Sequence, residues 1–552
     1  MLFVAAFNVI LEYVGADRRV VGYKMPGGRI EVLRGFMDDV SILTESVPLA
    51  KVALKRTETA VAWARMKLKP GKSRSVVMKK GMSMNVQPFA VGELDADIAK
   101  EEDVIPALQR KPLKTLGRFY DPLITDTWYK EVLKEKLLGK LKRLDRCHAR
   151  GAMKLWALHH IVLPQIRWDL MVYEIPVSCV EKLEGTVSKY IRFWLGISRN
   201  MSSVALYSQN SPCKLPLSSL VHLFKSTKLN AHCQLLNSAH EEVVSNVTPA
   251  YTGKKWKLYN PRKVVGITVD FGAVRRAEQR VSAVEIVGPV AQGRMGVEFA
   301  GGRDGKRPEL LAVRKKLVGT VAEDREEELL VKAARQSVQG RWIGWTNYNQ
   351  RVLTWKSLVY GDPKLYRFCL GATFDTLGSP ANLARWGIKE SDKCFLCDWY
   401  GIPEDPDKPD KLKGTVAHIL SGCQVSLAQG RWKYRHDSVL RVICHHLSLF
   451  LIQVKKKSND NLVFVPAGAS DGTRGRAKVR AGLLRSAVDW ILLDDLGRRL
   501  VFPAHIAQTS QRPDIVLYSS SSQTLVMVEL TCPCEENFDL QHMKKLDRMI
   551  VN

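Results

Sequence analysis

Residues 30–44 read IEVLRGFMDDVSILT, and this stretch decides the fold expected for the N-terminal part of the chain. Two short apolar runs, Ile30–Phe36 and Val40–Leu43, flank a polar turn. Runs rich in β-branched residues on either side of a tight polar turn are typical of a β-hairpin. The turn carries Asp38 and Asp39, two carboxylates that repel each other unless a divalent cation such as Mg²⁺ binds them. The alternative is an ordinary acidic turn, because Asp is a common turn residue.

Three motifs in this part of the chain resemble those of reverse transcriptases, and they come in the same order. Residues 36–39, FMDD, resemble the metal-binding turn of that family. Residues 66–73, MKLKPGKS, resemble the next motif, whose lysine lies near the incoming nucleotide. Residues 113–117, LKTLG, resemble the hairpin that grips the primer. Order and spacing together make this a specific signal.

The resemblance implies a partial reverse-transcriptase palm over residues 1–125. In it, Asp38 and Asp39 would bind catalytic Mg²⁺, and Lys72 would be the catalytic lysine. In the family an earlier strand carries a further catalytic aspartate, for which the 35 residues before Phe36 leave no room. Two-metal phosphoryl transfer needs carboxylates from both strands. We therefore expect no polymerase activity, and no primer extension, from the chain as it stands.

Length and charge narrow the class of protein. The chain has 552 residues, enough for about three to five domains of ordinary size. Its 84 basic and 56 acidic residues give a net charge of +28, which favours polyanionic partners. Nucleic acid is the leading expectation, and an anionic membrane surface is the weaker one. No run of about 18 apolar residues is present, so we expect no transmembrane helix, and the apolar residues 2–14 indicate a buried helix and not a signal peptide.

Residues 126–239 form a basic stretch with a helical apolar pattern. Its basic residues include Lys130, Lys134, Lys136, Lys140, Lys142, Arg143 and Arg146. A solvated helix face is the usual reason for such a run. Beside a palm, the functional interpretation is a thumb-like bundle whose basic face follows a nucleic-acid backbone. Residues 240–360 are expected to be a linker with embedded helices, one of them over residues 324–337.

A cluster of cysteine and histidine residues has the spacing of a metal site. Cys394 and Cys397 form a CxxC pair, and His418 and Cys423 follow after a long loop rich in Pro, Asp and Lys. Two cysteines on one turn and a His and a Cys on a following helix can close a tetrahedron around Zn²⁺. We predict a Cys₃His structural zinc knuckle within residues 361–430. The alternative is a set of buried thiols with an unrelated histidine.

A second carboxylate pair lies near the C-terminus. Arg512–Tyr518 and Thr524–Leu530 are expected to be two strands joined by a serine-rich turn. If the hairpin folds about the middle of that turn, Asp514 lies opposite Glu529. Directly opposed residues have Cβ atoms roughly 4.5–5.5 Å apart, which suits two carboxylates sharing one Mg²⁺. The alternative is an edge hairpin with two exposed acidic residues.

This pair resembles the Pro-Asp…Glu core of the restriction-like nuclease fold. The usual Glu-x-Lys would place a lysine two residues after Glu529, but that residue is Thr531. The family's endonucleases place a lysine on a following helix, and here such a helix would carry Lys544 and Lys545. We favour Lys545, which shares a face with Phe538 and His542 at helical spacing. Its role would be to orient the attacking water or to offset charge on the phosphate.

Residues 435–439, RHDSV, resemble the basic-His-acidic motif that precedes this nuclease core. The resemblance implies that His436 and Asp437 belong to the catalytic residues of a restriction-like α/β domain over residues 431–552. The alternative is a set of exposed polar residues at a helix start.

Residues 375–383, DTLGSPANL, resemble the lead-in to the knuckle in one branch of non-LTR retrotransposon proteins. The expected fold is therefore an α+β multidomain chain with a partial palm, a helical thumb, a zinc knuckle and a restriction-like nuclease domain. The resemblance is to the C-terminal part of a site-specific, ribosomal-DNA-element-like reverse transcriptase/endonuclease. It implies a Mg²⁺-dependent, DNA-nicking protein of target-primed reverse transcription.

The expected partners are target DNA and element RNA, the expected cofactors are Mg²⁺ and Zn²⁺, and the expected location is nuclear, without a membrane. The alternative is a catalytically silent nucleic-acid-binding remnant of a retrotransposon.

Overall fold

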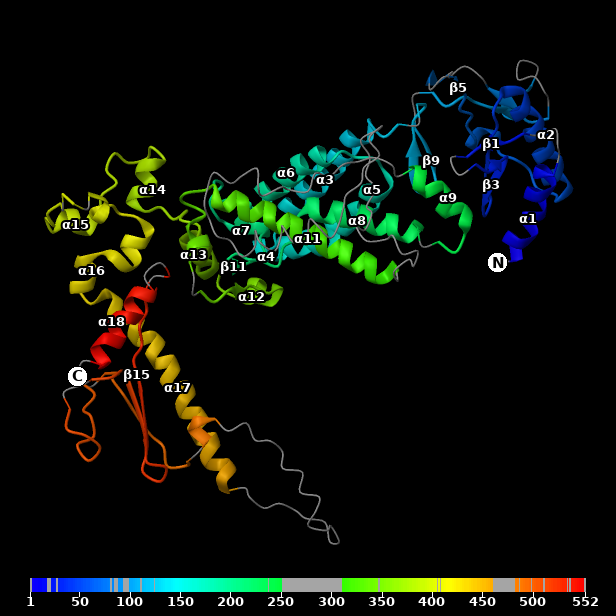
Figure 1. Ribbon diagram of the computed structural model, residues 1–552. Coiled ribbons are helices and arrows are strands. Elements are labelled where there is room, and N and C mark those ends of the chain that lie inside the picture. Colours follow the sequence, from blue (N-terminus) through cyan, green and yellow to red (C-terminus); the bar gives the residue numbers. More distant parts are fainter. Residues whose placement is uncertain are drawn as a thin grey trace, which may run out of the picture. The chain divides into compact units, whose positions relative to one another are not determined.

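The structure is a computed structural model, and it consists of two compact units. One unit is Met1–Gly340 with Arg351–Arg367, and the other is Arg341–Gln350 with Phe368–Asn552. The residues described are 2–250, 310–459 and 482–550, apart from residues 17–20, 26–27, 80–81, 84–87, 93–98, 110–111, 124, 237, 346–347, 405, 408, 486, 498, 510–511, 534 and 536–537. Helices and small, mostly antiparallel sheets alternate along the chain, which confirms the mixed α+β class (Figure 1).

The acidic stretch near the N-terminus forms the predicted hairpin. Strands β3 (Leu33–Phe36) and β4 (Asp39–Ile42) pair with Phe36 opposite Asp39, so that the turn has two residues. Met37 adopts a positive φ of 55°, which a tight two-residue hairpin turn requires. The turn was expected to include Asp39, but the structure places that residue at the start of β4.

Two helices cover this hairpin. Helix α1 (Leu2–Gly15) and helix α2 (Val47–Trp63) share a core with residues of β3 and β4. Its buried residues are Phe7, Ile10, Val14, Ala60 and Val61. The helix expected over residues 2–14 is therefore buried on one side, as predicted.

The remaining strands of this region are short. They are β1 (Tyr23–Lys24), β2 (Ile30–Glu31), β5 (Met78–Lys79), β6 (Met82–Ser83), β7 (Phe89–Ala90), β8 (Val104–Ile105), β9 (Leu113–Thr115) and β10 (Arg118–Tyr120). β9 and β10 form the second predicted hairpin. The Phe119 amide donates to the Tyr173 hydroxyl at 2.7 Å, and Trp168 Nε1 donates to the Gly117 carbonyl at 3.1 Å. These bonds fix the hairpin to the helices that follow.

Those helices form a bundle. They are α3 (Tyr129–Arg146), α4 (Gly151–Ala157), α5 (Leu163–Val172), α6 (Val177–Leu195), α7 (Val204–Tyr207), α8 (Leu220–Leu236), α9 (Glu241–Ala250), α11 (Leu310–Ala334) and α12 (Trp355–Tyr360), with the short parallel pair β11 (Cys213–Lys214) and β12 (Arg351–Val352). On α3, Leu133, Leu137 and Leu141 are fully buried at helical spacing. Lys136 and Lys140 of the predicted basic run are bound to Asp169 and Gln165.

Helix α11 lies in the region expected to be a linker with embedded helices, and it packs against α7 and α8. Buried Glu184 of α6 accepts hydrogen bonds from Arg325 Nη2 at 2.6 Å, from the Val221 amide at 3.0 Å and from the Ser219 hydroxyl. One carboxylate thus joins α6, α8 and α11. The predicted helix over residues 324–337 is part of α11, but α11 begins earlier and ends at Ala334.

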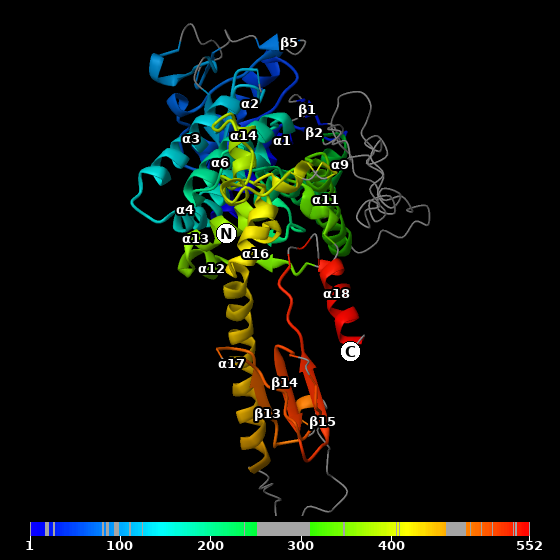
Figure 2. The ribbon, with the colours of Figure 1, turned by 90° about the vertical axis from the view of Figure 1, so that its left-hand side faces the viewer.

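The second unit begins with short helices and continues into one long helix beside a sheet. Its helices are α13 (Pro363–Thr373, which starts in the first unit), α14 (Pro380–Arg385), α15 (Phe395–Trp399), α16 (Gln424–Ala428), α17 (Arg431–Asn459) and α18 (Phe538–Ile550). The sheet has the order β13 (Ile491–Asp494), β14 (Ile515–Ser519), β15 (Thr524–Val528) and is antiparallel throughout. Both ribbon views show α17 running alongside it (Figures 1 and 2).

The central strand β14 is buried on both faces. Ile515 and Leu517 pack against α17 through Leu440 and Cys444, and Val516 packs on the other face against the segment that contains Leu500. Alternating residues of one strand therefore enter two cores, which fixes which residues face which side.

Helix α17 is long and apolar enough over Arg431–Lys455 to cross a membrane, by length and composition alone. A mostly buried core helix of a globular domain passes the same test, but only a small share of this stretch is buried, on the side that packs in the sheet core. We expected no transmembrane helix, and a single candidate of this kind is weak evidence for one.

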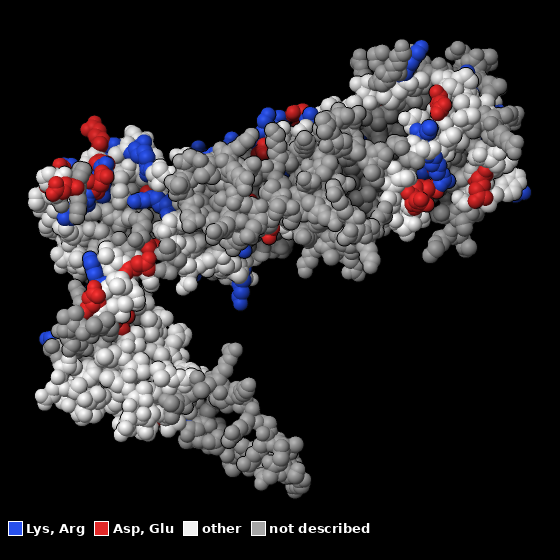
Figure 3. Space-filling model, in the orientation of Figure 1, with Lys and Arg blue, Asp and Glu red and all other residues white. Residues whose placement is uncertain are grey.

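On the face shown in Figure 3, the basic side chains of the described residues do not gather into one patch. Lys393 pairs with Glu404 at 2.6 Å and Lys413 pairs with Asp410 at 2.8 Å, so that blue and red side chains lie side by side around α15. Each of these two lysines is therefore neutralised by a neighbouring acidic side chain.

We predict that Glu184→Gln lowers the free energy of unfolding of the bundle by about 2–3 kcal/mol, because it removes the negative partner of half-buried Arg325. Urea denaturation, with hydrogen exchange of α11 as the local readout, measures the loss. Glu135→Gln is the matched control, since Glu135 is exposed on α3. Equal stability of the two variants would contradict the role given to Glu184.

Candidate zinc centre and candidate carboxylate site

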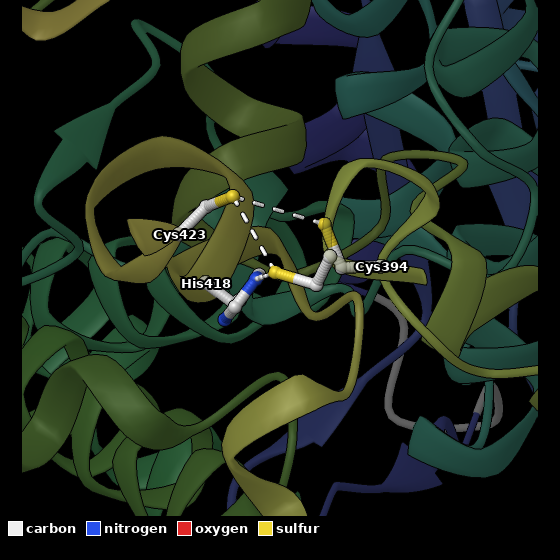
Figure 4. A group of neighbouring side chains, drawn as sticks. Cys394, His418 and Cys423 are labelled. Carbon is white, nitrogen blue, oxygen red and sulfur yellow. Dashed lines mark hydrogen bonds between the residues drawn. The ribbon is translucent and has the colours of Figure 1, made fainter. Parts of the chain in front are cut away.

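The predicted Cys₃His residues come together at one place in the second unit (Figure 4). The donor atoms of Cys394, Cys397, His418 and Cys423 all lie within 4.8 Å of one another. Sγ of Cys423 is 4.0 Å from Sγ of Cys394 and 3.7 Å from Sγ of Cys397. Sγ of Cys397 is 3.4 Å from Nε2 of His418.

These separations fit the edges of a zinc tetrahedron. With Zn–S bonds of about 2.3 Å and Zn–N bonds of about 2.0–2.1 Å, ideal S–S and S–N edges are roughly 3.8 and 3.5 Å. The distances between the side chains lie close to both values. The donor set and its size therefore fit a structural Zn²⁺ ion.

Backbone hydrogen bonds hold the ligands in this arrangement. The Cys394 amide donates to the Leu412 carbonyl at 2.8 Å, and the Ile402 amide donates to the Cys397 carbonyl at 3.0 Å. The His418 amide donates to the Thr415 hydroxyl at 3.1 Å, at the start of the turn that leads to Cys423. The long loop between the two halves is thus closed at its base, so its length does not displace the ligands.

The four ligands differ in how readily they reach the form that binds a metal. Burial lowers the pKa of His418, which favours the neutral, metal-binding imidazole, whereas burial raises the pKa of the Cys397 thiol to about 12 and so opposes formation of its thiolate in the absence of a metal. Burial also acts to raise the pKa of Cys423, but hydrogen bonds with Ser426, Cys397 and Cys394 together lower that pKa. A bound Zn²⁺ would deprotonate the thiols, so that metal binding contributes to folding.

The second candidate site forms where β14 begins and β15 ends. Their register pairs Ile515 with Val528 and Ser519 with Thr524. Asp514 and Glu529 are the next residues outward from the first of these pairs, which is the juxtaposition that the sequence predicted. Asp514 is buried, and one of its carboxylate oxygens accepts the Leu530 amide at 2.7 Å.

Lysine reaches this pair from α18. Lys545 Nζ lies 2.5 Å from Glu529 Oε2 and 4.0 Å from Asp514 Oδ2, whereas Lys544 is exposed. The structure therefore brings together the carboxylates and the lysine that the sequence favoured. Burial and the nearby charge of Asp514 raise the pKa of Glu529, although Lys545 acts in the opposite direction.

Histidine reaches the same pair from α17. His436 Nε2 lies 3.3 Å from Asp514 Oδ1, and its Nδ1 lies 3.2 Å from Asp437 Oδ1. We expected Asp437 to line the site directly. Its carboxylate instead contacts Nδ1 of His436, the ring nitrogen that does not face Asp514, so it orients the histidine.

The sequence reading missed the role of Arg435. Its Nη1 donates to the Leu420 carbonyl and its Nη2 donates to the Cys532 carbonyl, both at 2.8 Å. Its position beside His436 in the RHD motif was the available signal, but the two carbonyls are far away in sequence. Nothing in the motif indicates where a guanidinium group points.

The N-terminal candidate residues lie apart from any comparable cluster. Asp38 and Asp39 are exposed at the hairpin, and Lys72 is exposed at the end of a short 3₁₀ turn (Pro70–Lys72). Across the described residues, the one group of three or more Cys, His, Asp or Glu side chains close enough to share a metal ion is the Cys₃His cluster. Magnesium binding at Asp38 and Asp39 stays a prediction.

No protein-family model matches the chain, and a search of curated proteins finds no significant relative.

We predict that the purified full chain carries a single zinc ion that Cys397→Ser and His418→Ala each remove. Metal analysis of the purified variants measures this. Cys444→Ser, at a buried cysteine of α17 outside the cluster, should keep its zinc. Zinc retained in both ligand variants would contradict the assignment.

Proposed function

We propose that the second unit is a metal-dependent DNA-nicking endonuclease of the restriction-like type. One observation carries the proposal: Asp514 and Glu529, a lysine from α18 and a histidine from α17 meet at the same end of the sheet. Charged groups from separate elements, gathered beside a half-buried carboxylate pair, are typical of a catalytic site.

The carboxylate pair would hold a divalent cation, and Mg²⁺ is the natural candidate for a carboxylate and phosphate site. A cation bound there supplies a Lewis acid to the phosphodiester and to water. Because burial raises the pKa of Glu529, a proton competes more strongly with a cation for this carboxylate.

The remaining side chains have positioning and charge roles. Lys545 neutralises Glu529 in the free protein, and beside a phosphodiester its ammonium group would offset the negative charge that develops on the phosphate. His436 holds Asp514 in place through Nε2. The Asp437 carboxylate contacts Nδ1 of the same histidine and so fixes the orientation of its ring.

We further propose that the chain belongs with the reverse transcriptase/endonuclease proteins of site-specific non-LTR retrotransposons. In this account the nick supplies a 3′-hydroxyl that primes cDNA synthesis on element RNA, with Asp38 and Asp39 as Mg²⁺ ligands of the polymerase. The two hairpins formed by residues 33–42 and 113–120 support this account, because they coincide with the motifs of the resemblance. Target DNA and element RNA are the proposed partners, and the nucleus is the proposed location.

A catalytically silent nucleic-acid-binding protein is the second candidate. The observation that favours it is the exposed Asp38 and Asp39 pair, which lacks a third metal-donating side chain among the described residues. Such a protein would bind nucleic acid without cutting it.

We predict that Asp514→Asn and Glu529→Gln each abolish Mg²⁺-dependent nicking of supercoiled plasmid while DNA binding stays nearly unchanged. Each substitution keeps side-chain size but removes a negative charge from the proposed cation site. Asp547→Asn is the matched control, because Asp547 is an exposed acid of α18. A wild-type chain that binds plasmid but never nicks it would favour the silent protein.

We predict that Lys545→Ala lowers the nicking rate by about 10²–10³-fold, the usual cost of losing one preorganised charged group. The neighbouring substitution Lys544→Ala should leave the rate within about twofold, since surface changes away from a site have small effects. Single-turnover nicking rates of the two variants measure the contrast. Equal rates would refute the assignment of the lysine.

A further inference from the structure

Helix α17 takes part in two different cores of the second unit. Near its start, Trp432 packs against the cluster that contains the cysteines of the zinc centre. Farther along, Leu440, Cys444 and Leu451 belong to the core of the sheet. Because one continuous helix packs in both cores, a displacement of its first turn changes the packing in each of them.

Arg435 adds a second connection at this point. Its guanidinium group donates to the Leu420 carbonyl, which lies between the ligands His418 and Cys423, and to the Cys532 carbonyl. Cys532 follows Glu529 closely in the segment that leaves β15. A half-buried side chain thus joins the turn that carries two zinc ligands to the segment that carries a nuclease carboxylate.

The next residue completes the connection. His436 lies 3.3 Å from Asp514 Oδ1, and the Leu530 amide donates to Asp514 Oδ2 at 2.7 Å. The carboxylate of Asp514 is therefore held from α17 on one side and from the exit of β15 on the other. Arg435 contacts the backbone of that exit and is adjacent to His436 on the helix.

We propose that Arg435 is a positioning residue that makes zinc occupancy a condition for an aligned carboxylate pair. The proposal rests on the nuclease function above. With zinc bound, the turn from His418 to Cys423 is fixed and presents the Leu420 carbonyl to Arg435. Without zinc, that turn loses its cross-link, Arg435 loses one of its two acceptors, and the exit of β15 and His436 are both held less firmly.

The planar guanidinium group suits this role better than an ammonium group. Its two terminal nitrogens donate separately to two carbonyls from segments that are distant in sequence. A lysine offers one compact nitrogen and cannot reproduce this fork. The conservative substitution Arg435→Lys therefore breaks the connection while it keeps the positive charge.

Hydrogen exchange in the full chain tests the connection without any DNA. Removing zinc from the wild type with a chelator should speed exchange of the peptide 524–533, which contains the Leu530 amide, by about tenfold or more. In Arg435→Lys, exchange of this peptide should already be fast with zinc bound, and chelation should add little. Arg441→Lys is the matched control, since Arg441 is exposed on the same helix.

Two further readouts separate positioning from general damage. Arg435→Lys should keep its single zinc ion and leave exchange of α3 unchanged. In nicking assays the effects of His418→Ala and Arg435→Lys should be strongly non-additive, because both act through one connection.

The proposal is overturned if chelation leaves exchange of residues 524–533 unchanged in the wild type. It is also overturned if Arg435→Lys responds to chelation as the wild type does, or if the two substitutions are additive. A wild type that shows coupled exchange but never nicks DNA would refute the nuclease function and leave the connection established.

Discussion

The antiparallel register of β14 and β15 is the constraint on which the candidate carboxylate site depends. The pairing of Ile515 with Val528 sets Asp514 opposite Glu529 at the end of the strands. A slip by one residue would send the side chains of a strand to the other face. Here that would move Ile515, Val516 and Leu517 each into the opposite core, away from the neighbours they pack against, and each such side chain contributes about 1.5–3 kcal/mol when buried. The cores on both faces of β14 thus hold the acidic pair in place.

The zinc centre stabilises a second, smaller core. The cluster around Cys394, Cys397 and Cys423 contains few large apolar side chains, and part of its burial comes from the thiols themselves. A core of this size gains much of its stability from a bound metal. Because Trp432 packs on this cluster and the same helix continues along the sheet, the metal site and the carboxylate site are built on a common element.

Local patterns predicted the parts of this structure that depend on neighbours in sequence. The hairpin at residues 33–42, the Asp514–Glu529 register and the Cys₃His cluster follow from turn residues, strand symmetry and ligand spacing, which are local properties. The position of α11 was not predictable in this way, because its Arg325 binds Glu184 across 141 residues of sequence. The role of Arg435 was missed for the same reason. Its acceptors are the Leu420 carbonyl, on the turn between two zinc ligands, and the Cys532 carbonyl, in the segment after β15. The distinction between Lys544 and Lys545 needed the resemblance as well as helical spacing.

The proposed nuclease depends on cation binding where β14 begins and β15 ends, and a direct count of bound cation tests it. Mn²⁺ can replace Mg²⁺ as a probe, and electron paramagnetic resonance of the zinc-loaded full chain counts bound Mn²⁺. The account predicts that one Mn²⁺ site is lost in Asp514→Asn and in Glu529→Gln, and that Asp547→Asn retains it. Equal Mn²⁺ binding by the wild type and both carboxylate variants would contradict it.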